Sequence, residues 1–181
     1  EAAKHKLDID LHIVSAGYGL VPGDRKLAPY ECSFTGRGKG DLASWALLLN
    51  IPNDFRRLIC QPLDLTFLLL GDDYLSACQL DDRVQVGGPT IVFCGNSARK
   101  RLPEIAGLRY VPISNPEAKR FSCGLVSLKG ELTSRMLEAM VENSEIDAQY
   151  WLKTKDLLAI LDRPSTNEHK HSVDSQVKDP D

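Results

Sequence analysis

The residues best suited to ligand chemistry are short polar side chains, tyrosines and glycines that directly follow predicted strands. Such side chains hold hydrogen-bonding groups close to the backbone, and glycine lets the backbone approach a ligand. In an open parallel sheet, ligands bind beyond the carboxyl ends of the strands, so these positions should line one crevice. The candidates after the first three strands are Ser15, Tyr18, Gly19, Asp24, Tyr30, Gly71, Asp73, Tyr74, Asn96 and Ser97. The same residue types also serve as ordinary helix caps and turns.

The first of these segments, expected to be one loop from Ser15 to Asp24, is the longest and the most varied. Tyr18 lies between two glycines, and a ring held in this way can stack on a planar ligand such as a nucleobase, which contributes about 1–3 kcal/mol per base. Packing of Tyr18 or Tyr30 against the edge of the sheet is the alternative. If the site is catalytic, Asp24 or Asp73 is the candidate general base or water-orienting group.

Two further segments could contact an anion. Asn96 and Ser97 lie where a strand leads into a helix, whose first N–H groups are free to bind a phosphate or a carboxylate. Lys129 precedes a helix that we expect to begin near Glu131, and it could project toward an anionic ligand, although an exposed lysine is the simpler interpretation. The basic, glycine-rich segment 35–41 lacks the spacing of a phosphate loop. It could close over a ligand or contact a nucleic-acid backbone, and it could equally be only a linker.

The cysteines and histidines favour neither metal nor triad chemistry. The five cysteines are widely separated, with no pair at metal-ligand spacing, which indicates reduced thiols and a cytoplasmic protein. Cys60 and Cys94 are expected to be core residues, whereas Cys32 and Cys123 fall in predicted loops. No histidine is placed to activate either of these two thiols, and the sequence indicates no cofactor.

These candidates must be positioned by a single soluble domain. The chain has 181 residues, of which 43% are hydrophobic and 26% charged, and its net charge is -3. This composition is typical of one globular core, and no apolar run reaches the roughly 20 residues that span a bilayer. The near-neutral charge excludes a surface coated for phosphate binding, so a nucleic acid would have to meet a local patch.

Alternation of strands and helices defines the expected fold. Short apolar runs at residues 12–15, 65–70, 90–94 and 109–113 predict strands, and helical spacing between and after them predicts helices. Parallel neighbours need crossover connections, so we expect an α/β fold, a three-layer α/β/α sandwich with a mainly parallel central sheet. The domain should span residues 1–161. Residues 162–181 contain two valines as their only large apolar residues and predict a disordered tail.

Three segments resemble the small bacterial domains related to the YaaA peroxide-stress proteins. Ile13–Tyr30 is similar to a strand ending in Ser-Ala, followed by Tyr-Gly-Leu-Val, an acidic residue and a Pro-Tyr pair. Gly71–Tyr74 looks like the strand-Gly-x-x-Tyr element of that group, and Gly124–Gly130 like its Leu-Lys-Gly segment. Members usually begin with a further strand and a Cys- or Ser-containing loop followed by Lys. The chain lacks a counterpart, which suggests a fragment.

The resemblance implies a nucleobase-, nucleotide- or nucleic-acid-handling domain. The group is similar in architecture to uracil-DNA glycosylases and is associated with DNA binding and protection from oxidative stress, without a settled reaction. Fold analogy alone does not fix function. Two main hypotheses therefore remain open: an enzyme acting on a base or nucleoside, and a non-catalytic module that binds a nucleotide or nucleic acid in a stress-response or defence protein. A purely structural interaction domain is the third.

Overall fold

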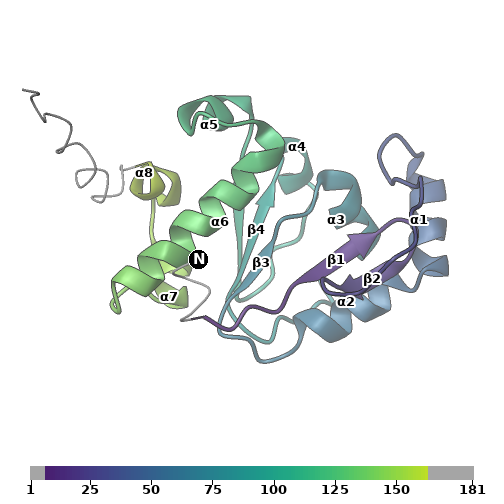
Figure 1. The fold of residues 1–181 in the computed structure, drawn as a ribbon, viewed down its shortest axis with the longest axis horizontal. Helices are drawn as coiled ribbons and strands as arrows, with labels where there is room; N and C mark the ends of the chain where they lie inside the picture. The colour runs from purple at the N-terminus through teal and green to yellow at the C-terminus, as the bar shows by residue number, and fades with distance from the viewer. Residues whose placement is uncertain (1–6, 163–181) are drawn as a thin grey trace, which may run out of the picture.

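The computed structural model describes residues 7–162, which form a mixed α/β fold (Figure 1). One sheet has three parallel strands in the order β3-β4-β5, and a separate sheet is a two-stranded antiparallel hairpin. The prediction of an α/β fold with a parallel sheet is therefore confirmed. The strands are β1 (His12–Ser15), β2 (Gly19–Pro22), β3 (Thr66–Leu68), β4 (Thr90–Cys94) and β5 (Leu108–Pro112).

The first strand does not join the parallel sheet. A turn over residues 16–18 returns the chain as β2, which pairs with β1 so that Ser15 faces Gly19 and His12 faces Pro22. Gly19 has φ +77°, and a Cβ there would lie 2.8 Å from the main-chain oxygen of Leu49. Only glycine adopts this conformation at little cost. The expectation of one long loop from Ser15 to Asp24 was therefore wrong.

The helices follow the predicted alternation, but the long helix begins at Leu125 rather than near Glu131. The helices are α1 (Lys39–Leu48), α2 (Ile51–Ile59), α3 (Asp72–Cys78), α4 (Asn96–Arg99), α5 (Asn115–Arg120), α6 (Leu125–Glu142), α7 (Ala148–Lys153) and α8 (Leu157–Leu161).

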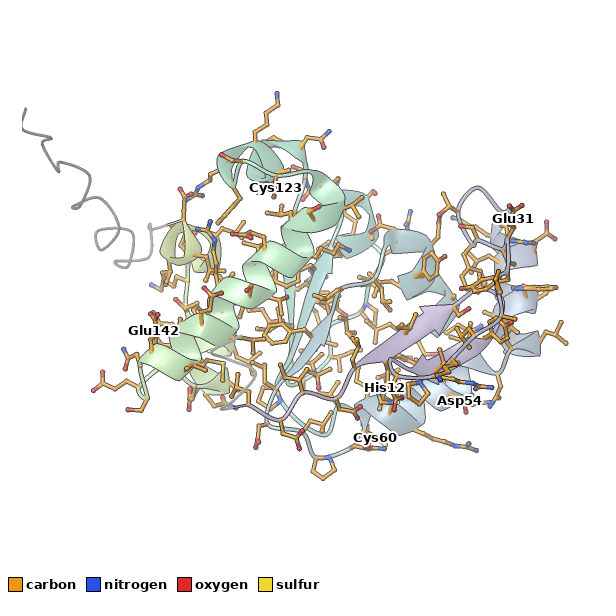
Figure 2. All side chains as sticks on the ribbon, in the orientation of Figure 1. His12, Glu31, Asp54, Cys60, Cys123 and Glu142 are labelled. Atoms are coloured by element: carbon orange, nitrogen blue, oxygen red, sulfur yellow. The ribbon has the colours of Figure 1, made fainter. Side chains whose placement is uncertain are left out.

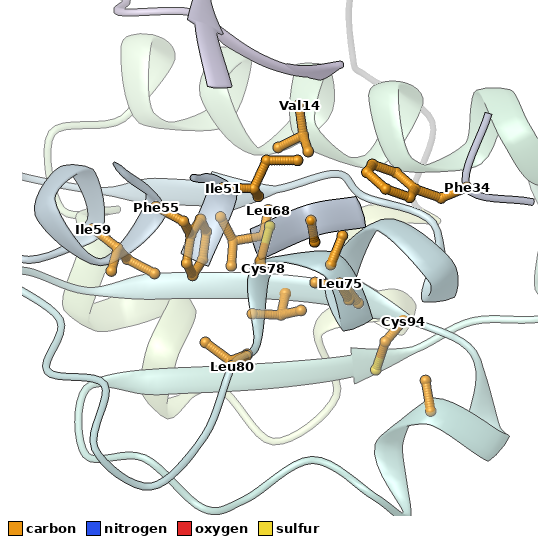
Figure 3. Close-up of a cluster of buried hydrophobic side chains, with 14 of the residues drawn as sticks. Val14, Phe34, Ile51, Phe55, Ile59, Leu68, Leu75, Cys78, Leu80 and Cys94 are labelled. Carbon is orange, nitrogen blue, oxygen red and sulfur yellow. The ribbon is translucent and has the colours of Figure 1, made fainter. Parts of the chain in front are cut away.

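The central strand β4 is buried along its whole length and divides two apolar clusters. Val92 and Cys94 belong to the cluster that contains residues of α1, α2 and α3, part of which is drawn in Figure 3. Ile91 and Phe93 belong to the other cluster, which contains residues of α5, α6, α7 and α8. The alternation arises because successive side chains of a strand point to opposite faces. The side chains of β4 therefore share apolar clusters with two different sets of helices.

Among residues 7–162, no helix combines the length and the hydropathy needed to cross a bilayer. The predicted tail, Asp162–Asp181, lies outside the described residues apart from its first member. The carboxylate of Asp162 accepts a hydrogen bond of 2.6 Å from Arg120 Nε and closes α8 against α5.

Candidate functional site

The loops that leave β3 and β4 are joined at the carboxyl end of the parallel sheet. Each loop enters a helix through an extended glycine, Gly71 before α3 and Gly95 before α4. Asp72 Oδ1 accepts a hydrogen bond of 3.1 Å from the main-chain N–H of Gly95. Asn96 and Ser97 follow in the first turn of α4, and both are exposed. The structure thus brings Gly71, Asn96 and Ser97 to one edge, as the sequence predicted.

Lys129 reaches the same edge from α6. Its ammonium Nζ donates to the main-chain oxygen of Leu70 and, at 3.0 Å, to that of Phe93. Leu70 lies just beyond the end of β3, and Phe93 precedes the last residue of β4. The side chain is half-buried, and burial lowers its pKa, against the opposing influence of Asp72 and Cys94. The expected position in a turn before the helix was wrong, because Lys129 lies inside α6 and its amine faces the sheet.

The tip of the β1–β2 hairpin is organised by the buried hydroxyl of Ser15. Its Oγ accepts hydrogen bonds from the N–H groups of Gly17 and Tyr18 at 3.2 and 3.1 Å, and donates to Tyr30 Oη at 2.6 Å. The Tyr18 and Tyr30 rings meet edge to face, with centroids 5.2 Å apart. Tyr30 remains 44% exposed, and its own O–H is left as a donor because Ser15 supplies the proton of their bond.

The segment after Tyr30 connects this hairpin tip to α3. Cys32 Sγ donates to the main-chain oxygen of Ala16 at 3.2 Å. Two residues further on, the buried ring of Phe34 packs edge to face against Tyr74 of α3, at 5.2 Å between centroids. The hairpin tip and the start of α3 are therefore connected through a few residues. The grouping of Ser15, Tyr18 and Tyr30 with Gly71 and Tyr74 in one ligand site stays a prediction.

Asp24 is not part of this arrangement. It follows Pro22, which pairs with His12 at the beginning of β1, so Asp24 lies at the opposite end of the hairpin from Ser15. The N–H of the intervening Gly23 donates to the carbonyl of Leu11 at 2.7 Å and holds the turn there. Figure 2 shows the separation through His12 and Glu31, which lie near the two ends. The predicted grouping of Asp24 with Ser15 was wrong, because the chain reverses at residues 16–18.

Asp73 lies in the first turn of α3 beside Asp72 and is half-buried. It stays near the edge of the sheet, as predicted. Sequence reasoning gave Asp72 no role, although both aspartates stand in the same Gly71–Tyr74 motif. The sequence does not show which of the two carboxylates faces Gly95, because the packing of α3 determines this.

Two residues near the hairpin tip were also missed. Trp45 Nε1 donates to the main-chain oxygen of Ala16 at 2.7 Å, and the guanidinium of Arg37 lies 5.4 Å from the Trp45 ring centroid. Arg37 Nε also donates to the Ser33 oxygen at 2.8 Å. The basic segment 35–41 is therefore anchored next to an indole ring. The signal available in the sequence was the helical spacing that places Trp45 on α1.

The thiols divide by exposure. Cys78 and Cys94 are buried, and burial raises the pKa of Cys78 to about 12 and also raises that of Cys94. Cys60 is exposed at the end of α2, so its assignment to the core was wrong. Within residues 7–162, no group of three or more Cys, His, Asp or Glu side chains is placed to hold a metal ion.

Comparison of the chain with protein-family models, curated proteins and solved structures gave no match. The resemblance to the YaaA-related domains consequently stays a prediction, and it depends on the three motifs quoted above.

Proposed function

We propose that the carboxyl edge of the parallel sheet binds a nucleobase- or nucleotide-like ligand. The observation that carries the proposal is the bond between Asp72 and Gly95, beside the contacts of Lys129 with Leu70 and Phe93. Together these contacts bring two glycine-led loops and a cation to one place, where backbone groups can approach a small ligand.

The hairpin tip supplies the aromatic surface of the proposed site. A base stacked on the exposed part of Tyr30 would also meet its phenolic O–H, and Tyr18 supports the ring from the side. Asn96 and Ser97 offer polar groups for a ribose or phosphate. If the protein acts on its ligand, Asp73 is the candidate general base, because it alone of the two predicted catalytic aspartates lies at this edge.

A non-catalytic module that binds nucleic acid is the second candidate. It is favoured by the exposed cation Arg37, whose guanidinium lies 5.4 Å from the Trp45 ring centroid, since single-stranded nucleic acids bind where cations and aromatic rings lie together. The net charge of -3 limits this candidate to a local contact.

Two finer expectations belong to the same proposal. The two clusters that flank β4 support a three-layer α/β/α arrangement around the parallel sheet. The five free cysteines support a cytoplasmic location, where thiols remain reduced.

The test uses Trp45, which is half-buried beside the hairpin tip, as a fluorescence reporter. The protein is titrated with each ribonucleoside monophosphate and with a short single-stranded DNA. We expect a saturable change for at least one monophosphate, weakened by Tyr30→Ala and retained by Tyr30→Phe, because stacking needs the ring. Trp45→Phe removes the reporter and controls for a signal from the buried Trp151. Binding of DNA alone, with no mononucleotide response, would favour the second candidate.

A further inference from the structure

An open cleft lies between α3 and α4, the two helices that leave the carboxyl edge of the parallel sheet (Figure 1). Its volume is about 200 Å³. Leu75, Leu80 and Leu102 line it with apolar side chains, and Asp72 and Arg101 line it with opposite charges. We propose that this cleft holds a guanine nucleotide, with the edge of the base on Asp72 and the phosphate on Arg101. The inference rests on the proposed function and names the ligand of that site.

The carboxylate of Asp72 has an oxygen that the fold does not use. Its Oδ1 accepts the hydrogen bond from the N–H of Gly95, whereas Oδ2 has no hydrogen-bond or ion-pair partner within the described residues. The hydroxyl of Ser76, which also lines the cleft, donates to the main-chain oxygen of Asp72 at 2.9 Å and not to this carboxylate. An ionised carboxylate only accepts hydrogen bonds, so Oδ2 calls for a ligand with N–H donors.

The guanidinium of Arg101 is also without a partner. Arg101 is exposed, and it forms no ion pair in the part of the chain that the structure describes. Its neighbour Arg99, by contrast, donates to the Glu104 carboxylate and to the main-chain oxygen of Leu102. Arg99 is thus used within the fold, and Arg101 is the arginine that remains for a ligand. Guanidinium groups bind phosphate through paired N–H donors.

The spacing of the two charged residues suits a mononucleotide. Asp72 is bonded to Gly95, and Arg101 follows Gly95 by six residues. At about 1.5 Å per helical residue, the main chain at Arg101 lies roughly 9 Å along the helix from the edge of the sheet. A mononucleotide carries its base edge and its phosphate at opposite ends of the molecule. A free amino acid carries its two charged groups on one carbon and fits this separation less well.

Guanine is the base whose edge best matches a carboxylate. Its Watson–Crick edge presents two adjacent donors, the ring N–H and the amino group. Adenine and cytosine place a ring acceptor beside the amino group, and uracil places its one N–H between two carbonyl oxygens. These acceptors would face the carboxylate oxygen of Asp72 and repel it, whereas guanine directs only donors toward it.

The experiment measures the affinity of the folded full chain for the monophosphates of guanosine, inosine, adenosine, cytidine and uridine, and for guanosine itself, by titration calorimetry. Guanosine monophosphate should bind about tenfold more tightly than guanosine, which lacks the phosphate, and about tenfold more tightly than inosine monophosphate, which lacks the amino group. These comparisons use only the wild-type protein and do not depend on the folding of a variant.

Two variants assign the contacts. Arg101→Ala should weaken binding of guanosine monophosphate about tenfold and leave binding of guanosine unchanged. Lys100→Ala is the matched control, because Lys100 is an adjacent exposed cation that does not line the cleft. Asp72→Asn should reduce the preference for guanosine monophosphate over inosine monophosphate, because the amide group replaces one acceptor oxygen with a donor.

The outcomes separate this inference from the proposed function. Tighter binding of another monophosphate, equal affinities for guanosine and its monophosphate, or equal effects of Arg101→Ala and Lys100→Ala would overturn the inference and leave a nucleotide site in place. Absence of binding by every monophosphate would overturn both.

Discussion

Asp72 Oδ1 accepts a 3.1 Å hydrogen bond from the main-chain N–H of Gly95 and joins the loops that follow two neighbouring parallel strands. The carboxylate thereby satisfies one of the free N–H groups at the start of α4, a helix without a side-chain cap of its own. A Cβ at Gly95 would lie 2.8 Å from Asp72 Oδ2, so the approach of the carboxylate also depends on the glycine.

The first prediction concerns this bond. Asp72→Ala should lower the free energy of unfolding by about 1–3 kcal/mol, the usual cost of removing one partner of a charge-assisted hydrogen bond. Asp72→Asn retains an oxygen acceptor and should cost less. Urea unfolding of the two variants checks the order, with Asp73→Asn as a control on the adjacent residue. Equal effects of the alanine and asparagine variants at position 72 would show that the bond to Gly95 contributes nothing.

The second prediction compares two glycines. Gly19→Ala must place a Cβ at φ +77° and 2.8 Å from the Leu49 oxygen, so we expect a loss of about 1–3 kcal/mol. Gly130→Ala lies within α6 in open space and should stabilise the protein by up to about 1 kcal/mol, because alanine is the better helix former. Thermal or urea unfolding of both variants shows whether each substitution lowers or raises the free energy of unfolding. If Gly19→Ala left the free energy of unfolding unchanged, the backbone at this position would accept alanine without strain, and the prediction would be wrong.

These two glycines also show what the sequence could and could not predict. Gly130 was interpreted as a turn before a helix, but the buried side chains of Leu128, Leu132 and Met136 continue the helix through it. Packing of a whole apolar face outweighs the weak preference of one glycine. Gly19 is the first residue of β2 and directly follows the three-residue turn that reverses the chain. The proline at the end of β2, Pro22, disfavours a strand in the sequence, so this short strand was not predicted. By contrast, strand β4 was predicted to the residue, because Thr90–Cys94 is apolar and bounded by glycine.

One missed element did carry a readable signal. Ser114 and Glu117 form a capping box around the start of α5, with a proline in its first turn. That combination predicts a helix start from spacing alone. The contacts of the candidate site, unlike the start of α5, have no local signal in the sequence. Contacts such as Asp72 with Gly95, or Lys129 with Phe93, join residues more than 20 positions apart, and no local pattern specifies them.

The third prediction follows from this capping box. The Ser114 hydrogen bond holds the pKa of Glu117 below its ordinary value of 4.5. A lowered pKa stabilises the folded state above 4.5, and the contribution is lost as the pH falls through the folded-state pKa. At pH 7 the free energy of unfolding of the wild-type protein should be about 1 kcal/mol higher than that of Glu117→Gln. This difference should become smaller below pH 4.5. The free energies of unfolding of both proteins, measured at pH 7 and below pH 4.5, test this prediction. A difference that does not change with pH would contradict it.

The fourth prediction concerns the thiols. Exposed Cys60 and half-buried Cys32 and Cys123 should react with a thiol reagent in the folded protein, whereas Cys78 and Cys94 should react only after unfolding. Burial and a raised pKa both suppress the thiolate at these last two positions. Mass spectrometry of labelled peptides with and without urea distinguishes the groups. Rapid labelling of Cys94 in native protein would show that the carboxyl end of β4 is open to solvent.

The most direct test of the proposed site is a nitrogen–proton NMR titration of the labelled protein with each ribonucleoside monophosphate. We expect saturable shift changes in the backbone amides of Gly71, Asp72, Gly95 and Asn96 and at the hairpin tip around Tyr18. These residues should respond together, with one dissociation constant, since they would contact a single ligand. The amides of Gly23 and Asp24, at the other end of the hairpin, should remain unchanged. No saturable change with any monophosphate, or changes confined to residues away from the carboxyl edge, would contradict the account.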